Sequence, residues 1–293
     1  MLELYQFELS HFSEKVRFIL DYKNLPYRKI EVTPGIGQLD LFRLSGQRQV
    51  PVLKDGDDLI AGSTAIAFYL EKKYPDPAIL PINAQQRALT LMLEEWADAS
   101  IALNGRTAMI GAFNQAPEFR KAFFPNQTPA ALTKLVNDLP DAARNLGNLV
   151  ASNLPNALKA VVGAVPGDVL SAGGAIAGFG SEAVAAAKAD LAQNLEALSL
   201  MLSEKPYLIG DQPTLADFAV AGLSMYIKFP ASPALDIPMG LKGQGVPGLA
   251  DNPAYKTFFD WRDKLYLDYR KIDETRPPVN TPAEGVPQKI SID

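Results

Sequence analysis

The fold can be worked out from the pattern in residues 49–66, Gln-Val-Pro-Val-Leu-Lys-Asp-Gly-Asp-Asp-Leu-Ile-Ala-Gly-Ser-Thr-Ala-Ile. Residues 50–53 are apolar and predict an edge or terminal strand, because the proline has no N–H to donate to a central ladder. The polar, glycine-containing run 54–58 predicts a turn, and 59–61 the returning strand. A helix is expected to begin at 62–63 and to continue to about residue 74.

The residues before this hairpin predict a crossover unit. Residues 2–7 predict a short strand, residues 12–23 an amphipathic helix, and residues 27–32 a second strand. A strand, a helix and a strand within about 30 residues are typical of a parallel pair with a crossover helix. With a short helix expected near 38–44, the first 75 residues predict the order β-α-β-α-β-β-α.

The residues after the hairpin predict an all-helical part that follows a linker. The linker covers 76–84 and contains prolines, which make it stiff. The helical part is expected to cover 85–272, and Asp273 to Asp293 to form a loosely held, proline-rich tail. Strong helical patterns occupy 85–112, 181–203, 214–229 and 252–269.

Residues 113–182 differ from their surroundings in composition, being rich in Ala, Asn, Gly and Pro. Apolar pairs three or four residues apart, such as Leu132 with Leu135, predict short helices packed on the helical part. An exposed surface for a ligand or a partner is the alternative for this segment.

The composition excludes several kinds of chemistry. The 293-residue chain contains no cysteine and a single histidine, His11, which excludes a protein thiol nucleophile, disulfides and thiolate or multi-histidine metal sites. We therefore expect no metal. The formal net charge of −5 argues against nucleic acid, and contact with a membrane surface is not favoured. Neither a secretory signal nor a membrane span is indicated, so a cytoplasmic location is expected.

Two hydroxyl groups at the start of the first helix are candidates for chemistry. Ser10 stands at the expected N-terminus, where unpaired N–H groups and the helix dipole favour negative charge. Its hydroxyl could donate to a bound thiolate, or it could simply cap the helix; the two roles can coexist. Ser13 is the second choice.

Three other short motifs have both a binding and a structural interpretation. The Val50-Pro51 bond is either cis, which would present the Val50 backbone to a peptide-like ligand, or an ordinary trans bond. Gly62-Ser63-Thr64 at a helix N-terminus can bind a carboxylate or merely cap the helix. Thr214 and Asp217 have the spacing of a capping box, which we interpret as structural.

The order and spacing of these motifs resemble one family. Residues 4–74 resemble the thioredoxin-like domain of glutathione transferases. Residues 205–218, Lys-Pro-Tyr-Leu-Ile-Gly-Asp-Gln-Pro-Thr-Leu-Ala-Asp-Phe, resemble the signature of that family's helical domain. Asn252-Pro-Ala-Tyr, followed by Phe259 and Trp261, resembles its last core helix. The resemblance implies an α/β thioredoxin-like N-terminal domain at 1–75 and an all-α C-terminal domain at 85–272, with an insertion at about 113–182.

The resemblance also implies a function and a set of site residues. Proteins of this family bind glutathione and activate its thiol for attack on a small hydrophobic electrophile. Carried over, Ser10 contacts the thiol, the Val50 backbone beside a cis Pro51 pairs with the cysteinyl part, and Ser63 holds the γ-glutamyl carboxylate. Gln49, near the glycyl end, and Thr64 complete the expected glutathione site. A homodimer is expected on the same analogy.

Two departures keep a second function open. The family usually has Glu, Asp or Gln immediately before the residue that matches Ser63, but this chain has Gly62, which predicts a lost contact to the γ-glutamyl ammonium group. The second departure is the insertion at 113–182. Together they favour the alternative of a non-catalytic protein that uses the same fold to bind a hydrophobic ligand or a protein partner.

Overall fold

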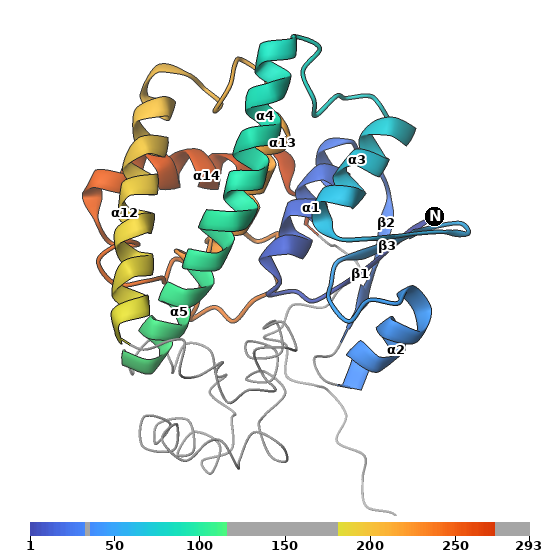
Figure 1. Cartoon of the computed structure of the whole chain (residues 1–293), viewed down its shortest axis with the longest axis horizontal. Coiled ribbons are helices and arrows are strands. Elements are labelled where there is room, and N and C mark those ends of the chain that lie inside the picture. Colours follow the sequence, from blue (N-terminus) through green and yellow to red (C-terminus); the bar gives the residue numbers. More distant parts are fainter. Residues whose placement is uncertain (33–35, 116–180, 273–293) are drawn as a thin grey trace, which may run out of the picture.

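The computed structural model describes residues 1–32, 36–115 and 181–272 (Figure 1). The predicted short helices of the insertion therefore lie almost entirely, and the predicted tail entirely, outside the described residues. The N-terminal part has the predicted order β-α-β-α-β-β-α. Its elements are β1 (Leu2–Gln6), α1 (His11–Tyr22), β2 (Tyr27–Glu31), α2 (Ile36–Ser45), β3 (Val52–Asp55), β4 (Asp58–Ala61) and α3 (Ser63–Lys73).

The four strands form one mixed sheet in the order β2-β1-β3-β4. β1 and β2 are parallel and joined by α1, while β3 is antiparallel to both β1 and β4. Leu4 pairs with Leu53 and Val52 with Ala61, so β3 has a partner on both sides and is an inner strand, not the edge or terminal strand predicted. Pro51, which has no N–H to donate, lies just before the ladder. The predicted α/β class of this part is confirmed.

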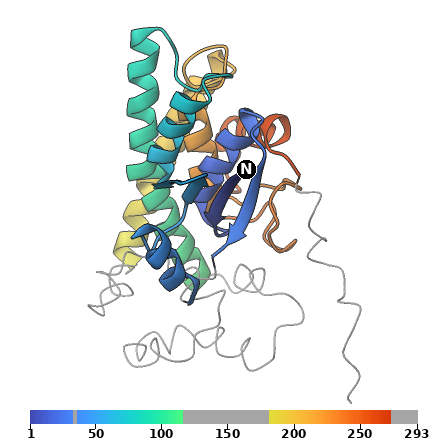
Figure 2. The same ribbon diagram turned by 90° about the vertical axis from the view of Figure 1, so that its right-hand side faces the viewer.

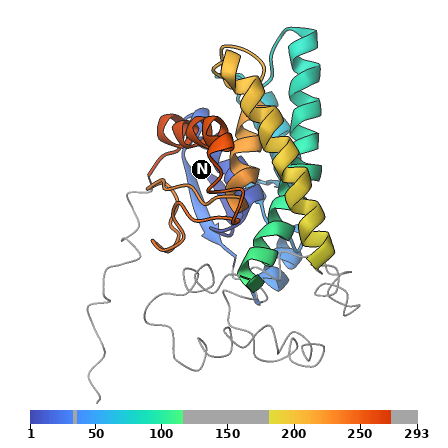
Figure 3. The same ribbon diagram turned by 90° about the vertical axis from the view of Figure 1, so that its left-hand side faces the viewer.

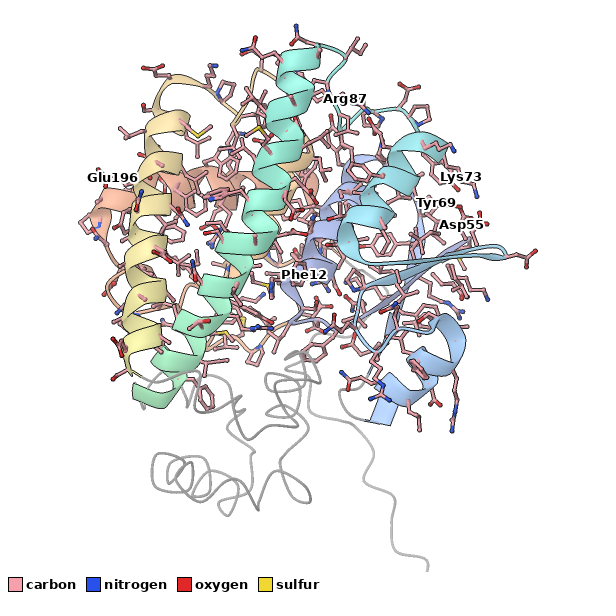
Figure 4. The ribbon with its side chains drawn as sticks, in the orientation of Figure 1. Phe12, Asp55, Tyr69, Lys73, Arg87 and Glu196 are labelled. Carbon is pink, nitrogen blue, oxygen red and sulfur yellow. The ribbon has the colours of Figure 1, made fainter. Side chains whose placement is uncertain are left out.

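A polar cluster attaches the β3–β4 hairpin to α3. The Asp55 carboxylate lies 2.7 Å from the Lys73 ammonium and accepts hydrogen bonds from the hydroxyls of Tyr69 and Tyr74 at 3.0 and 2.9 Å. Figure 4 labels Asp55, Tyr69 and Lys73 at the side of the molecule remote from the helical part. The cluster fixes α3 on the sheet, and with it the start of α3 next to the end of β4.

The second part is helical in the residues that the structure describes. The elements α4, η1 (a π-helical segment) and α5 follow one another as one long helical run. In this run α5 continues in nearly the same direction as α4 (Figures 1 and 2). Figure 3 shows α12 and α14 on the side opposite the sheet. None of the described helices combines the length and apolar composition that a membrane span requires. The elements are α4 (Ala84–Trp96), η1 (Ala97–Ala102), α5 (Leu103–Gln115), α12 (Ser181–Glu204), α13 (Leu215–Leu223), the 3-10 turns η2 (Ser224–Tyr226) and η3 (Pro253–Tyr255), and α14 (Lys256–Tyr269).

The helix predicted over 214–229 is shorter than expected. α13 ends at Leu223, and the 3-10 turn η2 follows directly. Pro230 disfavours helical backbone at Phe229, and the backbone of Phe229 instead exchanges hydrogen bonds with Gln244 and Gly243. After η2 the chain continues as an irregular, partly buried segment.

Helix α1 lies between the sheet and the helical part, and almost all of its side chains are buried. Every residue of α13, which packs against it, is buried too. The two helices approach so closely at Gly222 that a Cβ there would lie 2.8 Å from the Lys15 backbone nitrogen and 3.0 Å from its Cα. Glycine is required because the obstructing atoms are backbone.

We predict that Gly222→Ala lowers the free energy of unfolding by about 1–3 kcal/mol, because α1 and α13 must separate to admit the methyl group. Gly105→Ala in α5 is the matched control, since its Cβ would meet side-chain atoms at an ordinary 3.6 Å. Denaturant unfolding of both variants measures the difference. Equal stability of the two variants would show that the α1–α13 contact is not as tight as described.

The Asp217 carboxylate organises the start of α13. It accepts hydrogen bonds from the Leu208 N–H, the Thr214 N–H and the Thr214 hydroxyl, each at 2.8 Å. This geometry matches the reach of Asp217 back to Thr214 that a capping box requires, and it ties the preceding loop to the helix. Burial of the carboxylate raises the pKa of Asp217 to about 6, against the opposing effect of its donors.

The raised pKa predicts a pH-dependent stability. The folded protein binds this proton more tightly than the unfolded chain, in which an aspartate titrates near 3.9. The stabilising contribution is therefore complete below about pH 4 and is lost as the pH rises through about 6. Relative to Asp217→Asn, whose side chain does not titrate, the wild type should lose roughly 2–3 kcal/mol of its free energy of unfolding from pH 4 to 7. If the wild type instead gains stability relative to the variant over this range, the hydrogen bonds depress the pKa of Asp217.

Candidate functional site

A pocket of about 350 Å³ lies where the loop before β3, the start of α3 and the η1 segment meet. It joins the two parts of the molecule, because η1 belongs to the helical run. Figure 4 labels Phe12, from the first turn of α1, near the centre of the molecule. The residues that line the pocket are Phe12, Gln47, Gln49, Val50, Pro51, Ala61, Gly62, Ser63, Thr64, Ala65 and Asp98.

The loop before β3 offers a backbone edge to the pocket. The Val50–Pro51 peptide bond is cis, which the sequence left open. The Gly62 N–H donates to the Pro51 carbonyl at 3.1 Å and so joins this loop to the start of α3. Within the described part of the chain, the Val50 backbone has no hydrogen-bond partner. Its N–H and C=O are therefore available to an extended, peptide-like ligand.

The N-terminus of α3 offers a place for a negative charge. Gly62 is the N-cap, and it provides no side chain to accept from the first N–H groups of the helix. Those N–H groups, beginning with that of Ser63, carry the positive end of the helix dipole. A carboxylate in the pocket would satisfy them. Gly62 has a φ of +92°, so any other residue at this position would be strained.

Ser10 is the N-cap of α1, and its hydroxyl oxygen accepts a hydrogen bond from the Ser13 N–H at 3.2 Å. Because it acts there as an acceptor, its own proton remains free to be donated. Ser13 is fully buried, and its hydroxyl has no hydrogen-bond partner. Neither serine belongs to the pocket lining, which Phe12 reaches from the same turn. The structure thus brings together Gln49, Val50, Pro51, Ser63 and Thr64, while Ser10 caps α1 two residues before Phe12.

The buried imidazole of His11 lies against this turn. Its ring centroid is 4.5 Å from that of Phe12 and 4.4 Å from that of Tyr226, and neither ring nitrogen has a hydrogen-bond partner. Burial, with a smaller effect of the Arg106 charge, lowers the pKa of His11 to about 3. The imidazole is therefore neutral at physiological pH, and it supports Phe12 by packing.

Asp98 is the charged residue of the pocket, and it was not among the site residues expected from the sequence. It lies on η1 and accepts a hydrogen bond from the buried Lys15 ammonium at 2.8 Å and from the Thr64 hydroxyl at 3.1 Å. Lys15 also pairs with Glu94, and the Thr64 hydroxyl lies 2.6 Å from the same carboxylate. In sequence, the four-residue spacing of Glu94 and Asp98 on one helix face was the available signal, but such a pair is usually a solvated helix face.

Comparisons with known proteins agree with this arrangement. The family models "Glutathione S-transferase, N-terminal domain" and "Glutathione S-transferase, C-terminal domain" match residues 4–78 and 181–263. The chain belongs to the glutathione transferase superfamily. The predicted class, a thioredoxin-like domain followed by an all-helical one, is confirmed.

Individual relatives in this superfamily are similar over part of their length. The chain is 34% identical over 103 residues to a zeta-class glutathione S-transferase from Euphorbia esula, covering 34% of this chain and 46% of that protein. It is 37% identical over 89 residues to a maleylpyruvate isomerase from Ralstonia sp, covering 29% and 42%. The matched segments thus span less than half of these curated relatives.

A solved structure supports the fold over a greater length. The apo form of human glutathione-S-transferase T1-1 aligns with a TM-score of 0.54 and 20% identity, covering 91% of this chain and 84% of that one. At this identity the likeness concerns the fold alone.

Proposed function

We propose that this glutathione transferase superfamily member binds glutathione in the pocket and activates its thiol for attack on a small hydrophobic electrophile. The proposal rests on one observation: the unpartnered Val50 backbone and the uncapped N-terminus of α3 lie in the same pocket. An extended peptide with a terminal carboxylate fits that pair. Ser63 would hold the γ-glutamyl carboxylate, Val50 would pair with the cysteinyl part, and Gln49 and Thr64 would complete the site.

In this proposal Ser10 is the residue that activates the thiol. A hydroxyl that donates to the sulfur stabilises the thiolate and lowers the pKa of the bound thiol from its free value of about 8.5. The thiolate sulfur then forms a bond to an electrophilic carbon. In a substitution, a leaving group departs from that carbon with its bonding pair. In an addition to a double bond, the π pair moves to the neighbouring atom, which takes up a proton from water to replace the one that the thiol lost. Glutathione transferases and a maleylpyruvate isomerase among the relatives support either transfer or isomerisation as the outcome.

Calorimetric titration with glutathione, followed by an assay with model electrophiles, tests the function. Saturable binding with turnover supports the proposal. Saturable binding without turnover would favour the non-catalytic alternative, and an absence of binding at millimolar glutathione would contradict the proposal.

We predict that Ser10→Ala raises the pKa of the bound glutathione thiol by about 1–2 units, since a hydrogen bond to a charged group contributes roughly 1.5–3 kcal/mol. The ultraviolet absorbance of the thiolate, followed against pH, measures this pKa. Ser13→Ala is the matched control in the same turn and should leave it unchanged, because the Ser13 hydroxyl is fully buried. A shift in Ser13→Ala alone would reverse the assignment.

We also propose that the chain forms a homodimer through α3 and α4. Three large apolar residues of these helices stay exposed to solvent: Phe68 on α3, and Leu89 and Met92 on α4. The exposed fraction of Met92 is 68%. Sedimentation should give twice the chain mass of 31.7 kDa for the wild type and a shift toward that mass for Met92→Glu. Leu200→Glu, at an equally exposed apolar position on α12, is the control that should stay dimeric. A monomeric wild type, or a monomer only in the control, would contradict this surface.

A further inference from the structure

The peptide unit that joins Leu9 to Ser10 is hydrogen-bonded at both of its polar groups. The Ser10 N–H donates to the Phe7 carbonyl at 2.8 Å, and the Leu9 carbonyl accepts from the Tyr226 hydroxyl at 2.7 Å. The first bond is local to the turn before α1, whereas the second joins residues 217 positions apart in the chain. Because a peptide unit is planar, this one cannot rotate without breaking both bonds.

Tyr226 belongs to the 3-10 turn η2 and is almost completely buried. Its ring lies edge-on to that of His11, with the centroids 4.4 Å apart. Helix α5 backs it from the other side, because a Cβ on Gly105 would lie 3.9 Å from the Cβ of Tyr226. Tyr226 thus contacts the residue before Ser10 through its hydroxyl and the residue after Ser10 through its ring.

The Tyr226 hydroxyl is a permanent donor in this arrangement. A carbonyl oxygen can only accept, so the direction of the bond to Leu9 is fixed. Burial raises the pKa of Tyr226 far above that of an ordinary phenol, so its proton is retained at every working pH. Within the residues that the structure describes, no other residue of the helical part hydrogen-bonds to Leu9 or Ser10.

The two anchored ends of the peptide unit fix the direction in which the Ser10 side chain points. Ser10 has extended backbone, with φ −77° and ψ 113°, and its hydroxyl oxygen accepts from the Ser13 N–H. With the backbone and the oxygen both held, the hydroxyl proton is what remains to turn toward a bound sulfur. Hydrogen bonds weaken steeply as their geometry departs from linear, so a small rotation of the Leu9–Ser10 unit would weaken that donation.

We propose that Tyr226 is a positioning residue for thiol activation, which aligns the Ser10 hydroxyl by holding the Leu9 carbonyl and packing against His11. The inference rests on the proposed role of Ser10 and adds to it a residue of the helical part. Tyr226 does not line the pocket, so it acts through Ser10 and not by touching the ligand.

Tyr226→Phe tests this role, because it removes the hydroxyl and keeps the ring. The pKa of the bound glutathione thiol should rise by about 0.5–1 unit, less than in Ser10→Ala, because the serine hydroxyl is misaligned and not removed. Thiolate absorbance against pH measures this pKa. Below it, kcat with a model electrophile should fall by about 3- to 10-fold, while glutathione affinity by calorimetry stays unchanged. A role confined to satisfying the Leu9 carbonyl would lower the stability of the fold and leave the thiol pKa where it is.

A double variant shows whether Tyr226 acts through Ser10. In the Ser10→Ala background, Tyr226→Phe should leave the thiol pKa unchanged, and an equal shift in both backgrounds would overturn the inference. Tyr207→Phe is the matched control. It removes a hydroxyl 2.6 Å from that of Tyr269, whose ring contacts Tyr22 at the opposite end of α1 from Ser10. The control should keep the wild-type pKa, and a shift as large as that of Tyr226→Phe would also overturn the inference.

The remaining outcomes separate the inference from the function on which it rests. An unchanged thiol pKa in Tyr226→Phe, with a shift in Ser10→Ala, would overturn the inference and leave the proposed function intact. No glutathione binding, or no effect of Ser10→Ala, would refute both. Should Tyr226→Phe fail to fold, carbon NMR of the wild type with glutathione replaces it: the Leu9 carbonyl signal should titrate with the bound thiol, and a signal that does not titrate would overturn the inference.

Discussion

The burial of charged residues on α1 is the constraint on which the rest of the structure depends. Glu14, Lys15 and Arg17 lie within one turn of a helix between two layers, and all three are completely shielded from solvent. An unpaired charge in such a place is very costly, and removing one partner of a buried pair typically costs about 3–5 kcal/mol. Each of these residues therefore requires a partner from another element, and those partners determine where the elements lie.

The partners come from both parts of the chain. Arg17 pairs with Glu14 and with Glu8, which lies in the turn between β1 and α1. Arg270, directly after α14, returns to α1 and pairs with Glu14 and Asp21. Lys15 pairs with Glu94 and Asp98 on the α4–η1 run. The sheet, the helical run and the end of the last helix are thus fixed to one helix, and the pocket between η1 and α3 follows from that arrangement.

Much of the fold could be predicted because the deciding signals are local. The alternation of strands and helices in the first 75 residues follows from periodicity and turn chemistry, and the helix start at Ser63 follows from Gly62 and the preceding strand. The grouping of Gln49, Val50, Pro51, Ser63 and Thr64 could be expected from family resemblance, and the structure places these residues around one pocket. Their roles toward glutathione remain proposals.

Other features depend on contacts that no local pattern reveals. The polar residues of α1 suggest a solvated face, yet they are buried, because α13 and the α4–η1 run cover them. Asp98 enters the pocket only because that run packs across α1, and its π-helical segment has no signal that we recognised in the sequence. The cis bond at Pro51 likewise could not be chosen over trans from residue types.

The measurement that tests the account most directly is a backbone amide NMR titration of the protein with glutathione. The largest shifts should fall on the loop containing Val50, on Ser63 to Ala65 at the start of α3, and on Asp98. Shifts concentrated instead around another pocket of the described residues, which Tyr22, Ile82 and Gln212 help to line, would contradict this binding site. An absence of shifts at millimolar glutathione would contradict it as well.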